Sequence, residues 1–197
     1  MKLAFICGSG YGRSDSLIIT RKLRLLADDN ESEVFVFIRG SEGNDKYREI
    51  AKNGAHKVFV CDTGLNSFIE MCRLWIIRND IHMMAFQDTE EGRKMASVLA
   101  MMLDGGLTAD CINIEYDKKD GFQFFRAALS DSIVAKIKCI NTDYQLCTIK
   151  QNSFQIKKEL SYETGNIEYL KPEKEVKEAL AQVISSKKIE KKSVSLV

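Results

Sequence analysis

Short runs of consecutive apolar residues alternate with helix-like patterns along the first part of the chain. The apolar runs lie at residues 2–7, 33–40, 57–62 and 83–87. Helix-like patterns separate them at about residues 16–27, 45–53, 67–79 and 89–103. Buried strands that alternate with helices predict a parallel sheet that is covered on both faces and joined by right-handed crossovers.

The clearest helix follows the fourth apolar run. Asp88 or Thr89 is the expected N-cap, and Glu91 stands three residues after Asp88, a variant of the capping-box spacing. We expect Gly105 and Gly106 to end this helix, where a residue of left-handed backbone conformation is favoured. One apolar face lies between these signals, formed by Met95, Val98, Leu99, Met102 and Leu103. Taken alone, this stretch predicts a structural role and no functional site.

The pattern changes after Asp110. Strand-like segments follow one another at residues 111–116, 123–129, 133–140 and 145–150, with only turns between them. Residues 117–121 are a hairpin signal. Residues 134–139 alternate between outward lysines or valine and apolar partners, which is typical of an antiparallel strand with one wet face. We therefore predict an antiparallel strand meander on the C-terminal side of the parallel body.

The last part of the chain has its own pattern, so we predict an α/β domain at residues 1–150 and an extension at residues 151–197. Pro172 suits the first turn of an amphipathic helix at residues 172–185, with a charged segment behind it at 187–192. The apolar stripe of this tail helix is Val176, Ala179, Leu180, Val183 and Ile184. Two alternatives stay open: the helix packs on its own domain or on another protein.

Charge and composition restrict the class of partner. The net charge is +1, so no overall field attracts nucleic acid or a membrane surface. The apolar runs are too short to span a bilayer, and the first run is too short for a secretory signal. We therefore expect a cytoplasmic protein with neither nucleic acid nor membrane among its partners.

The cysteines and histidines suggest no reactive centre. The six cysteines lie at positions 7, 61, 72, 111, 139 and 147, a spacing that fits neither a zinc nor an iron–sulfur site. Most fall within apolar patterns, so we expect reduced, buried thiols. His56 and His82 have no acid or nucleophile beside them in the sequence. No metal site and no catalytic residue is predicted.

Two segments are candidates for binding an anion. Residues 8–12 form a glycine turn between a strand and a helix, as phosphate loops do. Their spacing is G-x-G-x-G, however, and the second strand ends in Arg39 where a ribose-binding acid is expected. A plain turn and a nucleotide contact therefore both stay open. At residues 87–93, Gly92 and Arg93 begin a helix, but three neighbouring carboxylates disfavour a phosphate there.

Several motifs resemble those of the α subunit of electron-transferring flavoproteins. The strongest is Gly92-Arg93-x-x-Ala96 followed by Leu103-x-Gly105-Gly106-Leu107-Thr108-Ala109-Asp110-Cys111. Weaker similarity lies at residues 54–58, 126–128, 135–139 and 145–149, and the match covers about residues 1–150. Ser130, Asp131 and Ser132 stand where the family usually has Gly-Gly-Asn.

The resemblance implies the N-terminal domain of that subunit, a doubly wound, Rossmann-like relative of adenine-nucleotide α-hydrolase folds. It also implies a similarly folded β subunit as partner and a mobile domain that carries FAD. We expect that flavin domain to be absent from this chain, so no flavin-binding residue is carried over.

These inferences predict a non-catalytic docking or scaffold subunit in electron transfer, which works with a flavoprotein β-like subunit or by self-association. The alternative is a module of the same fold that binds AMP or ATP for sensing or catalysis. Candidate contact residues lie where open α/β sheets place ligands, at the carboxyl ends of the strands. They are Ser9, Arg13, Thr89, Gly92 and Arg93.

Overall fold

The structure is a computed structural model, and it describes residues 1–9, 13–41, 44–129, 132–154, 162 and 165–177. Within these residues the elements run in the order β1 (Lys2–Cys7), α1 (Arg13–Asp28), β2 (Glu33–Arg39), α2 (Asn44–Lys52), β3 (Lys57–Cys61), α3 (Leu65–Asn79), β4 (Met83–Gln87), α4 (Glu90–Leu103), β5 (Gly106–Asp117), β6 (Gly121–Ala128), β7 (Ile133–Ile137), β8 (Gln145–Ile149) and β9 (Asn166–Tyr169).

All these strands join one sheet, in the order β7-β6-β5-β8-β4-β1-β2-β3-β9. From β5 to β9 in this order, each strand is parallel to the next, and the antiparallel pairs are β5–β6 and β6–β7. The sheet is therefore mostly parallel, and the prediction of a doubly wound α/β fold is confirmed.

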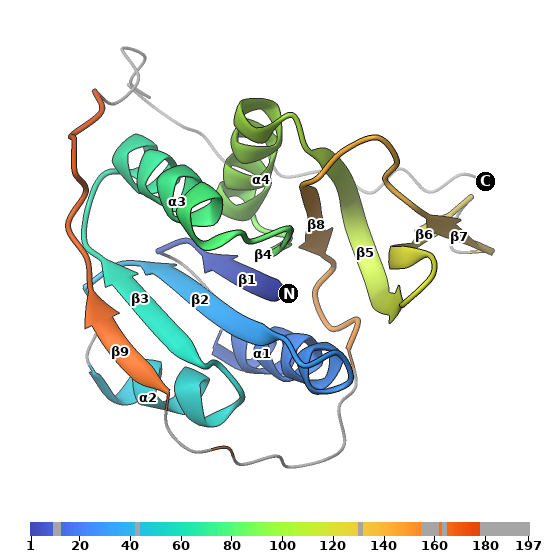
Figure 1. Ribbon diagram of the computed structural model, residues 1–197, viewed down its shortest axis with the longest axis horizontal. Coiled ribbons are helices and arrows are strands. Elements are labelled where there is room, and N and C mark those ends of the chain that lie inside the picture. The colour runs from blue at the N-terminus through green and yellow to red at the C-terminus, as the bar shows by residue number, and fades with distance from the viewer. Residues whose placement is uncertain (10–12, 42–43, 130–131, 155–161, 163–164, 178–197) are drawn as a thin grey trace, which may run out of the picture.

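Helices cover both faces of the sheet (Figure 1): α1 and α2 lie on one face, and α3 and α4 on the other. Successive residues of β1 supply the two cores, because side chains alternate across a strand. Leu3 and Phe5 pack on the side of α1, while Ala4 and Ile6 pack on the side of α3 and α4. Burial on both faces explains why these strands are continuously apolar.

The meander is shorter than predicted, because β8 does not belong to it. β8 lies between β4 and β5 and is parallel to both. Only β5, β6 and β7 form an antiparallel ribbon. Leu146 and Cys147 of β8 are fully buried on opposite faces, as expected in the interior of a parallel sheet. The predicted wet face of β7 is confirmed, since Val134 and Lys136 are exposed.

The end of α4 also differs from the prediction. The left-handed residue is Asp104, with φ of 51°, and neither glycine after it has positive φ. Both glycines instead allow close packing. A Cβ on Gly105 would lie 2.6 Å from Leu146, and one on Gly106 would lie 2.6 Å from the sulfur of Cys139.

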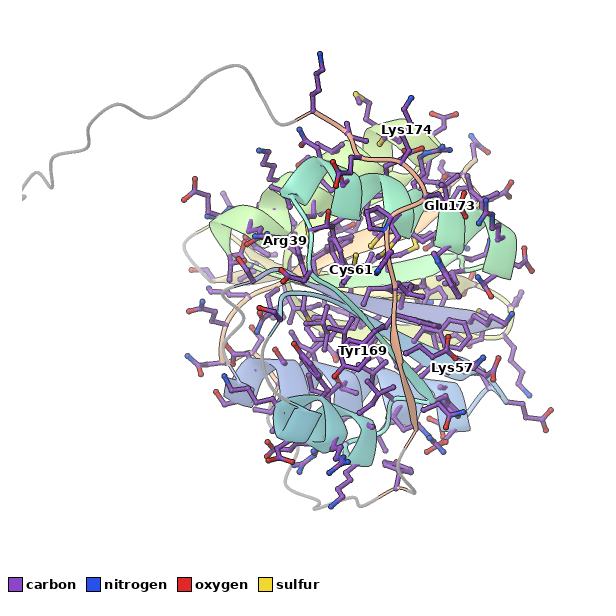
Figure 2. All side chains as sticks on the ribbon, turned by 90° about the vertical axis from the view of Figure 1, so that its left-hand side faces the viewer. Arg39, Lys57, Cys61, Tyr169, Glu173 and Lys174 are labelled. Carbon is purple, nitrogen blue, oxygen red and sulfur yellow. The ribbon has the colours of Figure 1, made fainter. Side chains whose placement is uncertain are left out.

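The chain after residue 154 returns to the free side of β3, which the sequence analysis did not predict. Figure 2 looks onto this edge, where β9, with Tyr169, runs beside the strand of Lys57 and Cys61. Before β9, the ring of Tyr162 lies 4.1 Å from the guanidinium carbon of Arg24 on α1.

After β9, the amide of Leu170 donates to the carbonyl of Val60 at 2.7 Å. The predicted start of the tail helix at Pro172 is wrong, because residues 171–177 are irregular. Their polar groups bond to α3 instead: Glu173 pairs with Arg78, and the Val176 amide donates to Ser67 Oγ at 2.8 Å. Residues 178–185 and the charged segment at 187–192 lie outside the described residues.

Candidate functional site

The chain changes direction across the sheet at β1. β1 is followed along the sequence by β2 and β3 on one side, and by β4 on the other. In open α/β sheets, the carboxyl ends of two such neighbouring strands border a crevice where ligands bind. Here Ser9 follows β1 and α4 begins just after β4, so this position is the first candidate site.

Three polar side chains meet at this position. Arg39, at the end of β2, donates from Nε to Oε1 of Glu91 on α4 at 2.6 Å. Ser9 donates to Glu91 Oε2 from its hydroxyl at 3.0 Å and from its amide at 3.2 Å. Arg39 also donates to the Ser9 hydroxyl at 2.7 Å and to the Thr63 carbonyl at 3.3 Å. We call Ser9, Arg39 and Glu91 the strand-end cluster.

Glu91 fills the space above the first glycine of the 8–12 turn. A Cβ on Gly8 would lie 2.5 Å from the carboxyl carbon of Glu91 and 2.7 Å from its Oε2. Gly8 is therefore needed for close approach, but the group that approaches is the chain's own carboxylate. An incoming phosphate would meet that negative charge at short range.

The cluster holds Glu91 in its ionised form. Burial raises the pKa of the Glu91 carboxyl, but the hydrogen bond and charge of Arg39, together with the two bonds from Ser9, outweigh burial. The net effect lowers the pKa of Glu91 below its ordinary value. Both Arg39 and Glu91 side chains are about four-fifths covered, so the pair is better shielded than a surface ion pair.

The start of α4 is closed by a cap. Thr89 is the N-cap, and its Oγ1 accepts from the Gly92 amide at 3.0 Å. A Cβ on Gly92 would lie 2.0 Å from the Gln87 carbonyl oxygen, so this turn requires glycine. Arg93 pairs with Asp88 at 2.8 Å. Glu91 does not complete a capping box with Asp88, since its carboxylate is bound in the strand-end cluster.

The candidate residues from the sequence analysis thus have different places. Ser9 belongs to the strand-end cluster, while Thr89 and Gly92 form the helix cap. Arg93 pairs with Asp88. Arg13 is the first residue of α1, and the structure describes its backbone only.

Sequence reasoning missed the pairing of Arg39 with Glu91. The predicted order of strands and helices could have indicated it, because the carboxyl end of β2 and the start of α4 lie at the same edge of a parallel sheet.

The segment most typical of the family resemblance is structural here. β5 has an irregular register between Thr108 and Cys111, and Asp110 within it has φ of 56°. The Asp110 amide donates to Thr148 Oγ1 at 3.0 Å, and the Cys111 thiol donates to the Thr108 carbonyl at 3.4 Å. This bend lets one strand pair with β8 in its first half and with β6 in its second.

The cysteines are packing residues, as expected. All six are free thiols, and five are buried while Cys139 is half-buried. Burial raises the pKa of the Cys7 and Cys72 thiols well above the ordinary value, which disfavours reactive thiolates. Among the described residues, no cluster of His, Cys, Asp and Glu could hold a metal ion.

The two histidines lie apart. His56 Nδ1 accepts from the Val34 amide at 2.9 Å. The ring of His82 stacks on Tyr144 with 5.9 Å between centroids, and its Nε2 lies 3.0 Å from Asp80 Oδ1, so the expectation that no acid stands beside His82 is wrong.

The antiparallel ribbon carries most of the strongly exposed apolar side chains near one end of the sheet. They cluster at the end of β6, on β7 and just beyond it: Leu129, Ile133, Val134 and Ile140. Val134 is 56% exposed and Leu129 is 74% exposed. Ile133 and Val134 are neighbours on β7 and point to opposite faces of the sheet, so together these side chains make the outer end of the sheet apolar. Exposed apolar residues concentrated at one end of a sheet favour a protein–protein contact.

Fold and site together define a class: a doubly wound α/β domain whose strand-end crevice is filled by its own side chains and whose ribbon exposes apolar residues. The electron transfer flavoprotein domain matches residues 76–175, about half of the chain. The chain therefore belongs to the electron transfer flavoprotein domain family.

Two curated relatives are similar along most of this chain. Subunit LctC of the lactate dehydrogenase (NAD(+),ferredoxin) of Acetobacterium woodii is 27% identical over 159 residues, which cover 78% of this chain and 38% of the relative. The electron transfer flavoprotein subunit alpha of Megasphaera elsdenii is 29% identical over 154 residues, which cover 74% of this chain and 45% of the relative. This chain therefore spans less than half the length of either relative.

FAD, which the family implies, does not fit the strand-end position. Its phosphates would have to replace Glu91, which already satisfies Arg39 and Ser9. Glu90 adds further negative charge at the same helix end, where Asp88 is already paired with Arg93.

No described helix is long and apolar enough to cross a membrane.

Proposed function

We propose that this chain is a docking subunit in electron transfer, which binds a flavin-bearing partner and does not itself react. Membership of the electron transfer flavoprotein family supports the electron-transfer role. Both relatives carry the word subunit in their names, and assembly with another chain follows from that analogy. The partner expected from the family is a flavoprotein β-like chain.

The observation that carries the proposal is the exposed apolar surface of the ribbon. Leu129, Ile133, Val134 and Ile140, which we call the ribbon patch, lie on the outermost strands of the sheet or just beside them. Next to them, the exposed Lys136 adds positive charge, while the exposed Lys138 is paired with Asp120 at 3.3 Å. A partner that covers this patch has an apolar surface bordered by carboxylates.

The flavin comes from the partner in this proposal. The strand-end position supports this assignment, because Glu91 occupies the place that a phosphate would take. We also infer work in the cytoplasm, since six free thiols are typical of a reducing compartment. A nucleotide-binding function has no observation in its favour at this position.

Affinity purification from the native cell tests the proposal. The tagged chain is expected to bring down a second chain, and the complex is expected to show flavin absorbance. Val134→Asp places a charge in the ribbon patch, which should weaken the complex about a hundredfold because the charge is desolvated on docking. The retained flavin absorbance measures the loss.

Met101→Asp is the matched control. Met101 is an apolar residue that is more exposed than Val134, but it lies on α4, and its replacement is expected to leave the complex intact. Thermal unfolding verifies that both variants are folded. Stoichiometric flavin on the isolated chain, or full retention of the partner by Val134→Asp, would contradict the proposal.

A further inference from the structure

An apolar groove lies between α3 and α4, on the face of the sheet opposite α1. Its volume is about 200 Å³. Its lining residues are Asn66, Ile69, Glu70, Val98, Met102 and Val176. Four of these six side chains are apolar, and Met102 is 41% exposed in the described part of the chain. Exposing these apolar side chains to water is unfavourable, so the groove is a candidate docking site for apolar side chains.

The chain itself leads into this groove. Val176, which lines it, is held by two hydrogen bonds with the Ser67 hydroxyl, at 2.8 and 3.5 Å. One residue later, the carbonyl of Lys177 accepts from Asn66 Nδ2 at 3.0 Å. Ser67 and Asn66 belong to the first turn of α3. The end of the described chain is therefore fixed beside the groove.

The sequence that follows carries apolar residues at the spacing that a groove between helices accepts. Leu180, Val183 and Ile184 recur at i, i+3 and i+4, and Gln182 stands between them on the opposite side of such a pattern. Leu180 is three positions after Lys177, a span of at most about 10 Å. Leu180 is therefore within reach of the groove.

We propose that the groove between α3 and α4 is the docking site of the chain's own residues 178–185, with Leu180, Val183 and Ile184 against Met102 and Val98. Continuity of the chain favours this occupant over a second copy or another protein. A segment tethered next to its site acts at an effective concentration of the order of millimolar, which an untethered competitor must exceed.

Docking of residues 178–185 in the groove is independent of the proposed function, but it affects which surfaces a partner can reach. With the groove between α3 and α4 covered by residues 178–185, the ribbon patch stays available to a partner. The two surfaces lie on different elements, so their tests are separate.

Oxidation of methionine by dilute hydrogen peroxide tests the proposal on the full chain. Met102 lines the groove, whereas its neighbour Met101 is 76% exposed and does not, so Met101 is an internal standard. Peptide fragmentation in a mass spectrometer separates the two sulfoxides. In Leu180→Asp/Val183→Asp, oxidation of Met102 should be roughly threefold or more faster than in the native chain, with Met101 unchanged.

Gln182→Asp is the matched control, because it adds the same charge outside the apolar stripe. It is expected to leave Met102 protected. Should the double variant be unfolded, which faster oxidation of the buried Met95 would reveal, Leu180→Ser gives the same comparison.

Equal rates of Met102 oxidation in the native chain and in a folded variant with Leu180 replaced would overturn the proposal. So would loss of protection in Gln182→Asp. Protection that increases with protein concentration would also overturn it, because the occupant would then be a second copy.

Discussion

At the scale of the residue, Glu91 determines what the strand-end crevice can bind. Its carboxylate receives donors from Arg39 and Ser9 and lies against Gly8. An ionised group that is bound in this way does part of what a ligand phosphate does elsewhere: it satisfies the cation and the amide at the end of the sheet. The hydrogen-bond donors of Arg39 and Ser9 at this site are therefore already satisfied by a side chain of the same protein.

We expect Glu91→Gln to lower the free energy of unfolding by about 1 to 2 kcal/mol at neutral pH, since charged hydrogen bonds are replaced by neutral ones in a partly covered pair. Urea unfolding measures the change. The folded pKa of Glu91 lies below its ordinary value of 4.5, so this stabilisation is present above pH 4.5. It is lost as the pH falls through the lower, folded pKa.

Glu90→Gln is the control for this prediction. It makes the same chemical change one residue earlier, on an exposed side chain in the first turn of α4. Only a few tenths of a kcal/mol should be lost there, from the helix dipole. If the two variants lose equal stability, or if the Glu91→Gln loss does not depend on pH, the cluster does not stabilise the fold.

At the scale of the element, the returning chain around β9 connects the two helical layers. Tyr162 contacts α1, β9 pairs with β3, and Glu173 and Val176 contact α3. This segment contains little regular secondary structure, yet it contacts α1, β3 and α3 in turn. Gly165 allows it to approach the sheet, because a Cβ there would lie 2.3 Å from the Ala55 carbonyl oxygen.

Gly165→Ala should therefore detach β9 locally and leave the rest of the sheet intact. We expect the amides of Tyr162 and Leu170, which bond to Lys52 and Val60 in the native chain, to exchange hydrogen about thirtyfold faster. Exchange followed by mass spectrometry or NMR measures this effect.

Glu168→Ala, on an exposed position of β9, is the control and should change these rates little. Unchanged exchange at both amides in Gly165→Ala would show that the close approach at Gly165 does not hold this segment.

At the scale of the whole molecule, two surfaces differ in character. The carboxyl edge of the sheet is polar and occupied by the strand-end cluster, whereas the antiparallel ribbon exposes the ribbon patch. A doubly wound fold that binds nucleotides uses the first surface. The arrangement here favours the second, which is the surface that we propose for a partner chain.

AMP and ATP are accordingly expected to leave the thermal unfolding of the chain unchanged. A nucleotide that bound at 100 times its dissociation constant would add about 2.7 kcal/mol, a shift that differential scanning fluorimetry detects readily. Sodium sulfate at matched ionic strength controls for the general effect of salt. A saturable shift with either nucleotide, absent with sulfate, would restore the alternative of a nucleotide-binding module.

Much of the fold follows from local pattern. The apolar runs that became β1 to β4, and the helices between them, were predicted close to their observed bounds. The N-cap at Thr89 was one of two alternatives. These elements are readable because burial of a strand or of one helix face imposes its own periodicity on the sequence.

Other elements depend on contacts between distant parts of the chain. β8 has the same local pattern as a meander strand, and only its position between β4 and β5 makes it parallel. β9 is too short and polar to be read as a strand, and pairing with β3 creates it. The prediction that a helix starts at Pro172 was also wrong because of a distant contact: the Val176 amide donates to the Ser67 hydroxyl on α3.

The sequence by itself determined the class of this protein: alternating strands and helices, an unreactive set of buried thiols, and the motifs of the electron transfer flavoprotein family. The tertiary structure decided how the site is used. Whether the glycine turn receives a phosphate depends on which side chain from another strand end lies above Gly8. Local sequence encodes periodicity, but the pairing of Arg39 with Glu91 exists only once the sheet brings their strand ends together.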